Sequence, residues 1–136
     1  MHFDLVDAVV AMDDTSITTL KAVTQAEEYL QDHFPSFPVL PGVLMIEALT
    51  QAARRWLDAH GEADTRYTLA GVKALKYGMF VKPGETMRVS VSVRKRHDDG
   101  RTDFTGNAVI LRPGMDESDA ETCVSGRFTM RPLSFG

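Results

Sequence analysis

His33 and Glu47 are the two side chains of this sequence whose types and surroundings suit proton transfer. Both belong to the stretch HFPSFPVLPGVLMIEALTQAA, residues 33–53. Prolines restrict the loop that follows the histidine and would hold its imidazole in place, as a general base requires. They are Pro35, Pro38 and Pro41. Glu47 follows in an apolar run, where removal of water disfavours a charged carboxyl and keeps it available as an acid near neutral pH.

Both residues also have a purely structural interpretation, which the sequence leaves open. A lone histidine is more often structural or exposed than catalytic. Glu47 is the first of several polar residues that recur at helical spacing, which is typical of a solvated helix face. These residues are Glu47, Thr50, Gln51, Arg54, Arg55 and Asp58. The other histidines, His2, His60 and His97, fall at the terminus, a helix end and a turn, so we assign them no role.

A long helix has to carry Glu47. We expect it to begin at Pro41 or Gly42 and to end near His60 and Gly61, because proline suits a first helical turn and glycine a C-terminal cap. A short helical segment at 25–31 and a loop at 32–40 should precede it.

Strands account for most of the remaining chain. Residues 87–93 alternate apolar and polar side chains, which predicts a half-buried strand. Residues 102–111 and 122–130 repeat the pattern after turn sequences, and residues 3–11 and 16–23 predict an opening hairpin. The short connections favour antiparallel neighbours. The sequence therefore predicts an α+β domain with one long helix among five to seven strands.

Composition excludes several classes of protein. The 136 residues fit one domain, and 43% hydrophobic with 25% charged residues is typical of a globular chain. The net charge of −4 argues against general nucleic-acid binding, although residues 94–97 form a short basic run. The first fourteen residues hold four acids and no Lys or Arg, unlike a signal peptide, and no apolar run reaches the ~20 residues of a membrane span. We expect a cytoplasmic protein.

Cysteine and metal chemistry are not expected. Cys123 is the only cysteine, so an intrachain disulfide and a cysteine-rich zinc site are both impossible. It falls in a predicted strand without an adjacent base, and H-E-x-x-H spacing is absent. The sequence predicts neither a metal site nor a cofactor.

The stretch from His33 resembles the pattern H-F-P-x-x-P-x-x-P-G-V-L-x-x-E-A-x-x-Q of the 3-hydroxyacyl-[acyl-carrier-protein] dehydratases of FabZ type. Residues 69–85, LAGVKALKYGMFVKPGE, resemble the strand and Pro-Gly turn that follow the helix in that family. The resemblance implies a single hot-dog domain over residues 1–136, in which a curved antiparallel sheet wraps a long central helix.

The resemblance also implies a role for each residue of the motif. His33 is the general base, Glu47 assists departure of the 3-hydroxyl as water, and the backbone N–H of Gly42 stabilises the thioester oxygen. That last role agrees with helix chemistry, because N-terminal amides lack an intrahelical partner and attract negative charge. The other substrate-binding positions are Phe34, Pro41, Val43 and Gln51. Glutamate rather than aspartate at the acid position indicates a dehydratase that does not isomerise its product.

The implied substrate is a (3R)-3-hydroxyacyl thioester, which is converted to the trans-2-enoyl thioester in fatty acid, lipid or polyketide biosynthesis. Acyl carrier protein or coenzyme A would carry it. An acidic carrier requires a local basic patch, for which the candidates are Arg54, Arg55, Lys73, Lys76 and Lys82. Family resemblance and the apolar first half of the helix predict a homodimer with shared active sites, with hexamers as trimers of dimers.

Two alternative functions remain open on the same fold. One is a thioesterase that uses Glu47 or a bound water and has little need of His33. The other is a non-catalytic acyl-binding subunit, because Asp32 and Ser36 stand where many relatives have glycine, and the loop geometry depends on them.

Overall fold

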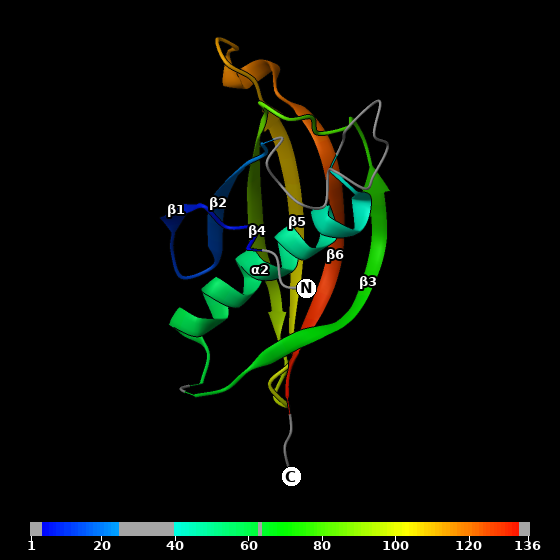
Figure 1. Ribbon diagram of the computed structural model, residues 1–136. Helices are drawn as coiled ribbons and strands as arrows, with labels where there is room; N and C mark the ends of the chain where they lie inside the picture. Colours follow the sequence, from blue (N-terminus) through cyan, green and yellow to red (C-terminus); the bar gives the residue numbers. More distant parts are fainter. Residues whose placement is uncertain (1–3, 25–39, 63, 134–136) are drawn as a thin grey trace.

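The computed structural model describes residues 4–24, 40–62 and 64–133 of the chain (Figure 1). The predicted helical segment at 25–31 and nearly all of the loop at 32–40 lie outside them. The elements, in order, are β1 (Ala8–Met12), β2 (Ser16–Ala22), α2 (Gly42–His60), β3 (Tyr67–Tyr77), β4 (Thr86–Arg96), β5 (Thr102–Leu111), a 3₁₀ turn (Glu117–Asp119) and β6 (Glu121–Pro132).

The six strands form one antiparallel sheet in the order β1-β2-β4-β5-β6-β3. The predicted opening hairpin is present, although its first strand begins at Ala8 rather than near Phe3. Its turn is closed by Asp13, whose Oδ1 accepts hydrogen bonds from the N–H groups of Thr15 (2.9 Å) and Ser16 (2.8 Å). In β4, Met87, Val89 and Val91 are buried, as their alternation predicted.

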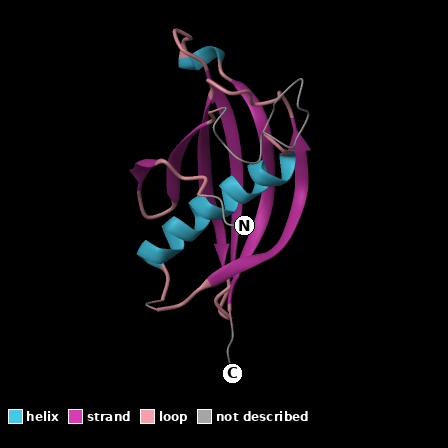
Figure 2. Ribbon diagram, viewed as in Figure 1, coloured by secondary structure: helices cyan, strands magenta, loops and turns pink. Residues whose placement is uncertain are grey.

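Helix α2 crosses the concave face of this curved sheet (Figure 2). It buries residues that recur every three or four positions, which places them on one face of the helix. They are Met45, Ala48, Leu49, Ala52, Ala53, Trp56 and Leu57. The facing core comes from the inward side chains of the sheet, among them Phe104, Ile110, Phe128 and Met130. A long helix wrapped by a curved antiparallel sheet is the hot-dog fold, so the predicted architecture is confirmed.

The two ends of α2 each meet a tyrosine of β3. A Cβ added at Gly42 would lie 2.9 Å from ring atoms of Tyr77, and one added at Gly61 would lie 2.6 Å from the hydroxyl of Tyr67. β3 therefore runs the length of the helix in the opposite direction, and α2 begins near the arrowhead of β3 (Figure 1). Across the described ranges, α2 included, no helix is both long and apolar enough for a membrane span.

Candidate functional site

The start of α2 presents backbone donors at one edge of the sheet. Pro41 is the N-cap residue, and its carbonyl accepts the first helical bonds, from the N–H groups of Leu44 (3.0 Å) and Met45 (3.3 Å). The amides of Gly42 and Val43 precede those donors and point out of the helix end. No acidic side chain occupies the first turn. This end of the helix is therefore suited to stabilise negative charge on a bound group.

Glu47 lies one turn further along α2, held by polar side chains of the same helix. Its Oε1 accepts hydrogen bonds from Gln51 Nε2 and from Arg54 Nη1, each at 3.3 Å. Because these residues follow Glu47 by four and seven positions, they share its face of the helix. Within the described ranges, Glu47 Oε2 makes no hydrogen bond, so one carboxyl oxygen is anchored and the other is available.

The partners of Glu47 are themselves fixed from outside the helix. Gln51 Oε1 accepts a hydrogen bond of 2.7 Å from the N–H of Leu5, and Arg54 Nε donates to the carbonyl of Tyr67 at 3.3 Å. The N-terminal segment, α2 and β3 thus converge on one carboxylate. An acid held in this way keeps a constant position, which proton transfer needs.

The surroundings of Glu47 are more polar than its sequence neighbours suggest. Its side chain is 38% exposed, and its carboxylate contacts Arg54 and Gln51 rather than apolar surface. The polar helix face predicted from the sequence is present for Glu47, Gln51 and Arg54. Thr50 does not belong to it, because Thr50 is buried and its hydroxyl donates to the carbonyl of Ile46 at 3.0 Å.

Apolar side chains are exposed around the start of α2. Val43 is 70% exposed and Tyr77 is 51% exposed. Met79 and Phe80, which follow Tyr77 closely in sequence, are also exposed. Leu40 is buried, and its N–H donates to the carbonyl of Val81 at 2.8 Å, which joins the segment before the helix to the loop after β3. Three of the predicted site residues form the start of the helix, namely Pro41, Gly42 and Val43, and Glu47 and Gln51 follow in its first half. The predicted His33 and Phe34 lie outside the described residues.

Sequence reasoning missed two neighbours of the site. Arg54 could have been recognised as a partner of Glu47, because a spacing of seven places both on one helix face. Tyr77 against Gly42 had no such signal, since that contact depends on how β3 aligns with the helix.

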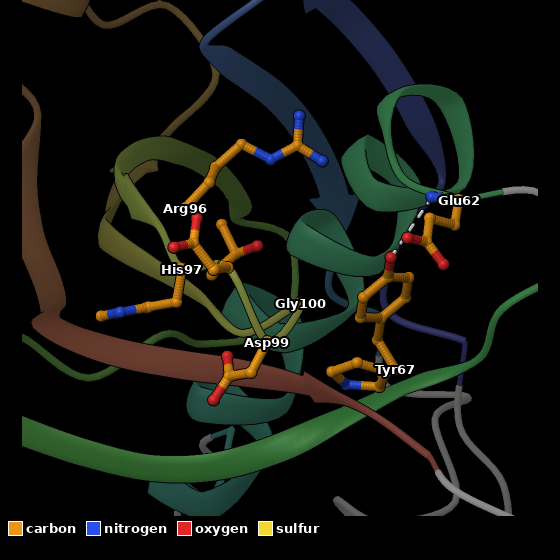
Figure 3. Close-up of a pocket in the computed structure, with 9 residues that line it drawn as sticks. Glu62, Tyr67, Arg96, His97, Asp99 and Gly100 are labelled. Atoms are coloured by element: carbon orange, nitrogen blue, oxygen red, sulfur yellow. Dashed lines mark hydrogen bonds between the residues drawn. The ribbon is translucent and has the colours of Figure 1, made fainter.

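Two cavities flank the helix without including Glu47. One cavity, of about 310 Å³, lies beside the polar face of α2 and is lined by Asp4, Gln51, Arg54, Arg55 and Asp58. Another of about 330 Å³ lies at the far end of α2, where Tyr67, Arg96, His97 and Asp99 surround it (Figure 3).

Cys123 is a free, buried cysteine of β6. Burial raises the pKa of the Cys123 thiol to about 11, so it stays neutral and poorly nucleophilic near pH 7. The residues outside the gaps contain no group of three or more His, Cys, Asp or Glu side chains that could hold a metal ion.

Comparison with known families assigns the chain to a family. The model of the ApeI-like family, described as ApeI dehydratase, matches residues 9–112, which include α2 and five of the six strands. The chain belongs to this dehydratase family. It is therefore an enzyme of the dehydratase class, as its sequence predicted.

Curated relatives carry a dehydratase name. The chain is 37% identical over 113 residues to "3-hydroxyacyl-[acyl-carrier-protein] dehydratase FabZ" of Variovorax paradoxus (strain S110), a match that covers 79% of this chain and 75% of that one. It is 41% identical over 95 residues to the protein of the same name from Lactococcus lactis subsp. cremoris (strain SK11), covering 69% and 66% of the two chains. The FabZ resemblance of the motif is thus confirmed over most of the dehydratase domain.

Solved structures support the fold. A protein from Erwinia carotovora subsp. atroseptica aligns with a TM-score of 0.67 at 23% identity, covering 92% of this chain and 90% of that one. A mutant of the fluoroacetyl-CoA-specific thioesterase FlK aligns with a TM-score of 0.66 at 14% identity, covering 98% and 90%. At these identities the likeness establishes the shared hot-dog fold alone.

Proposed function

We propose that this chain removes water from (3R)-3-hydroxyacyl thioesters to give trans-2-enoyl thioesters, without a cofactor. The observation that carries this proposal is Glu47, with one oxygen anchored by Gln51 and Arg54 and the other available. It lies one turn from the outward-pointing amides of Gly42 and Val43. An acid beside an oxyanion donor is what elimination next to a carbonyl requires.

The reaction moves one proton from carbon and one to oxygen. His33 takes the proton from C2, the electron pair of that C–H bond forms the C2=C3 double bond, and the C3–O bond breaks. Glu47 gives a proton to the departing hydroxyl, which leaves as water. Proton exchange with solvent returns both side chains to their starting states.

Charge develops on the thioester oxygen during this step, because the C2 proton is only weakly acidic. The N–H of Gly42 donates to that oxygen at the positive end of the helix dipole. Around the thioester oxygen, the residues that line the substrate are Pro41, Val43, Phe34 and Gln51. Gln51 acts chiefly through Glu47, since its amide nitrogen donates to that carboxylate.

The carrier of the acyl group is acyl carrier protein, with coenzyme A as the second candidate. The names of the FabZ relatives state the first. Among the basic residues suggested for docking, Arg54 is already engaged by Glu47 and the carbonyl of Tyr67. Exposed Arg55, Lys73 and Lys76 are better placed to meet an acidic carrier.

The proposed assembly is a homodimer, with trimers of dimers as its larger form. Its support is the apolar surface at the start of α2, where Val43, Met79 and Phe80 are exposed in one chain. A second copy that covers this surface would bring its own His33 loop to the helix end. In this arrangement the histidine of one protomer and the glutamate of the other complete each site.

The thioesterase alternative has no separate observation in its favour. Likeness to FlK concerns the fold, and the motif residues are those of the dehydratases. Release of free thiol from an acyl thioester, without enoyl formation, would overturn the proposal in favour of hydrolysis.

The direct test follows enoyl formation by ultraviolet absorbance with 3-hydroxyacyl thioesters on both carriers. We expect Glu47→Gln and His33→Ala to lower the rate by ~10²-fold or more, as when a positioned acid or base is lost. Asp58→Asn is the matched control, because Asp58 is exposed on the same helix. Wild-type rates in either site variant, with unchanged melting, would remove that residue from the mechanism.

Shared sites are tested by mixing subunits. His33→Ala and Glu47→Gln chains refolded together should regain activity, because a mixed dimer has one site with both changes and one with neither. Random pairing makes roughly half of the dimers mixed, so about a quarter of all sites are intact. Mixed dimers, verified by mass, that remain as inactive as their parents would refute the shared site.

A further inference from the structure

Tyr77 lies over the N-terminal end of α2. The position of a Cβ on Gly42 is 2.9 Å from Cε1 and Cζ of the Tyr77 ring and 3.1 Å from its hydroxyl oxygen. In a helix the Cα–Cβ bond tilts toward the N-terminus. The phenol therefore lies on the side of Gly42 toward which the first amides of the helix point, and only a glycine leaves room for it.

The backbone holds Tyr77 firmly in this place. It pairs with Val124 of β6, and the next two amides, of Gly78 and Met79, donate to the carbonyls of Cys123 (2.9 Å) and Thr122 (3.1 Å). A Cβ on Gly78 would lie 2.2 Å from the carbonyl oxygen of Thr122, so this close approach requires glycine. The end of β3 is thus a fixed platform for the tyrosine.

A β-bulge determines which way Tyr77 faces. Between Lys73 and Lys76 the strand β3 carries one more residue than β6, and Ala74 in this bulge has a φ of 52°. One extra residue reverses the alternation of side chains beyond it. Without the bulge, Tyr77 would point to the other face of the sheet, away from Gly42.

The Tyr77 hydroxyl has no hydrogen-bond partner among the described residues, and 51% of the residue is exposed. Tyr67, at the other end of α2, has its hydroxyl engaged by the N–H of Glu62 at 3.4 Å (Figure 3). A free phenol O–H beside the helix N-terminus is a donor available to a ligand.

We propose that the Tyr77 hydroxyl donates a second hydrogen bond, beside the N–H of Gly42, to the thioester carbonyl oxygen of the substrate. This inference rests on the proposed dehydration and adds a catalytic residue to it. When the C2 proton is removed, negative charge grows on that oxygen, and both donors are already in place. Tyr77 keeps its proton throughout, so the balance of the elimination is unchanged.

Tyr77→Phe tests the hydroxyl alone, because the ring that packs on Gly42 remains. We expect kcat to fall roughly 10- to 100-fold, as for the loss of one oxyanion donor, with KM changed less than about 2-fold. Tyr67→Phe is the matched control and should retain the wild-type kcat, because Arg54 donates to the backbone carbonyl of Tyr67, which the change leaves in place. Circular dichroism and melting of both variants verify the fold.

A second measurement separates a hydrogen bond from a structural effect. The product enoyl thioester, labelled with ¹³C at its carbonyl, is bound to wild type and to each variant and examined by difference infrared spectroscopy. Loss of a donor strengthens the C=O bond, so the band should move to higher wavenumber in Tyr77→Phe and stay in place in Tyr67→Phe.

The outcomes distinguish this inference from the proposed function. An unchanged kcat, or a lower kcat with an unshifted carbonyl band, overturns the donor role of Tyr77 while the dehydration itself stands. A wild-type protein that forms no enoyl product overturns the dehydration, and the role of Tyr77 with it. A lower kcat together with the shifted band supports both.

Discussion

The two ends of α2 use the same pair of residue types for different purposes. At each end a glycine of the helix region packs against a tyrosine of β3, Gly42 with Tyr77 and Gly61 with Tyr67. Tyr67 is only 8% exposed, whereas Tyr77 is 51% exposed. The contact geometry is similar, and the difference lies in what surrounds it.

The C-terminal end is completed within one chain. The buried Trp56 donates its Nε1–H to the carbonyl of Asp13 at 3.0 Å, and its ring stacks on His60 with centroids 4.5 Å apart. The guanidinium of Arg96 lies 5.4 Å from the Trp56 ring centroid, and its Nη2 donates to the carbonyl of His60 at 3.2 Å. These contacts engage the carbonyl of His60 and both the ring and the Nε1–H of Trp56, and they fix the last turn.

The N-terminal end is left incomplete in the described chain. Exposed Val43 and Tyr77 surround backbone donors, and Glu47 offers a free carboxyl oxygen. Incomplete burial and unused donors are costly in a structural element but useful at a binding site. The comparison teaches that changes at the C-terminal end should affect stability, whereas changes at the N-terminal end should affect activity.

Of the changes at the two glycine–tyrosine contacts, Gly42→Ala has the largest expected effect. The new methyl group must displace the Tyr77 ring, and because Tyr77 is half exposed it can move at little cost in stability. Displacement removes the phenol from the oxyanion position and crowds the substrate carbonyl. We expect kcat/KM to fall by about 10²-fold, with a melting temperature within about 2 °C of wild type.

A double-mutant cycle sharpens this prediction. If Gly42→Ala acts by moving Tyr77, adding Tyr77→Ala should cause little further loss, because the two changes share one mechanism. Independent, multiplicative losses would show that the methyl group acts on the substrate without the tyrosine. Comparable instability of Gly42→Ala and Gly61→Ala would erase the proposed difference between the ends.

Gly61→Ala should have the opposite profile. Its backbone φ of −87° suits any residue, but a Cβ there would lie 2.7 Å from the carbonyl oxygen of Leu57 and 2.6 Å from the Tyr67 hydroxyl. The carbonyl belongs to the helix backbone and the tyrosine is buried, so neither moves easily. We expect a loss of about 2 kcal/mol in the free energy of unfolding, measured by urea titration, at unchanged kcat.

Much of this architecture could be predicted from the sequence because it depends on local periodicity. The alternation of residues 87–93 and the helical spacing of apolar residues from Met45 to Leu57 each specify one buried face. The helical pattern around Glu47 likewise placed this residue on the long helix. Gly61 was predicted as the C-terminal cap, and it does occupy that position. Its backbone is extended rather than left-handed, so glycine is required there because a larger residue would clash with Leu57 and Tyr67.

What the sequence could not predict depends on register between distant segments. Tyr77 faces Gly42 because β3 contains the bulge at Ala74. No local sequence pattern predicts one extra residue in a strand. The bond from Leu5 to Gln51 joins residues 46 positions apart. Such contacts are fixed by the assembled sheet and helix rather than by neighbours in sequence.

The smallest expected effect concerns Thr129→Val in β6, whose side chain lies on the opposite face of the sheet from its buried neighbours Phe128 and Met130. Thr129 Oγ1 donates to Asp103 Oδ1 at 2.6 Å, and His97 Nε2 lies 2.9 Å from Oδ2. These hydrogen bonds, that of Thr129 first, lower the pKa of Asp103 below its usual value. A lowered pKa in the folded state contributes stability above the unfolded value near 3.8, and that stability is lost as the pH falls through the folded value.

Valine has nearly the shape of threonine, so its main effect should be the loss of this hydrogen bond. We expect Thr129→Val to lower the free energy of unfolding by about 1 kcal/mol at pH 7 and by less at pH 2, because protonation of Asp103 at low pH removes the part of the stability that depends on its charge. Urea titrations at the two pH values measure the difference. Since Thr129 lies away from Gly42 and Glu47, kcat should equal that of wild type.

An equal loss of stability at both pH values would mean that Asp103 is not the hydrogen-bond partner through which Thr129 contributes stability. A fall in kcat comparable to that of Gly42→Ala would mean that this position in β6 is coupled to the start of α2.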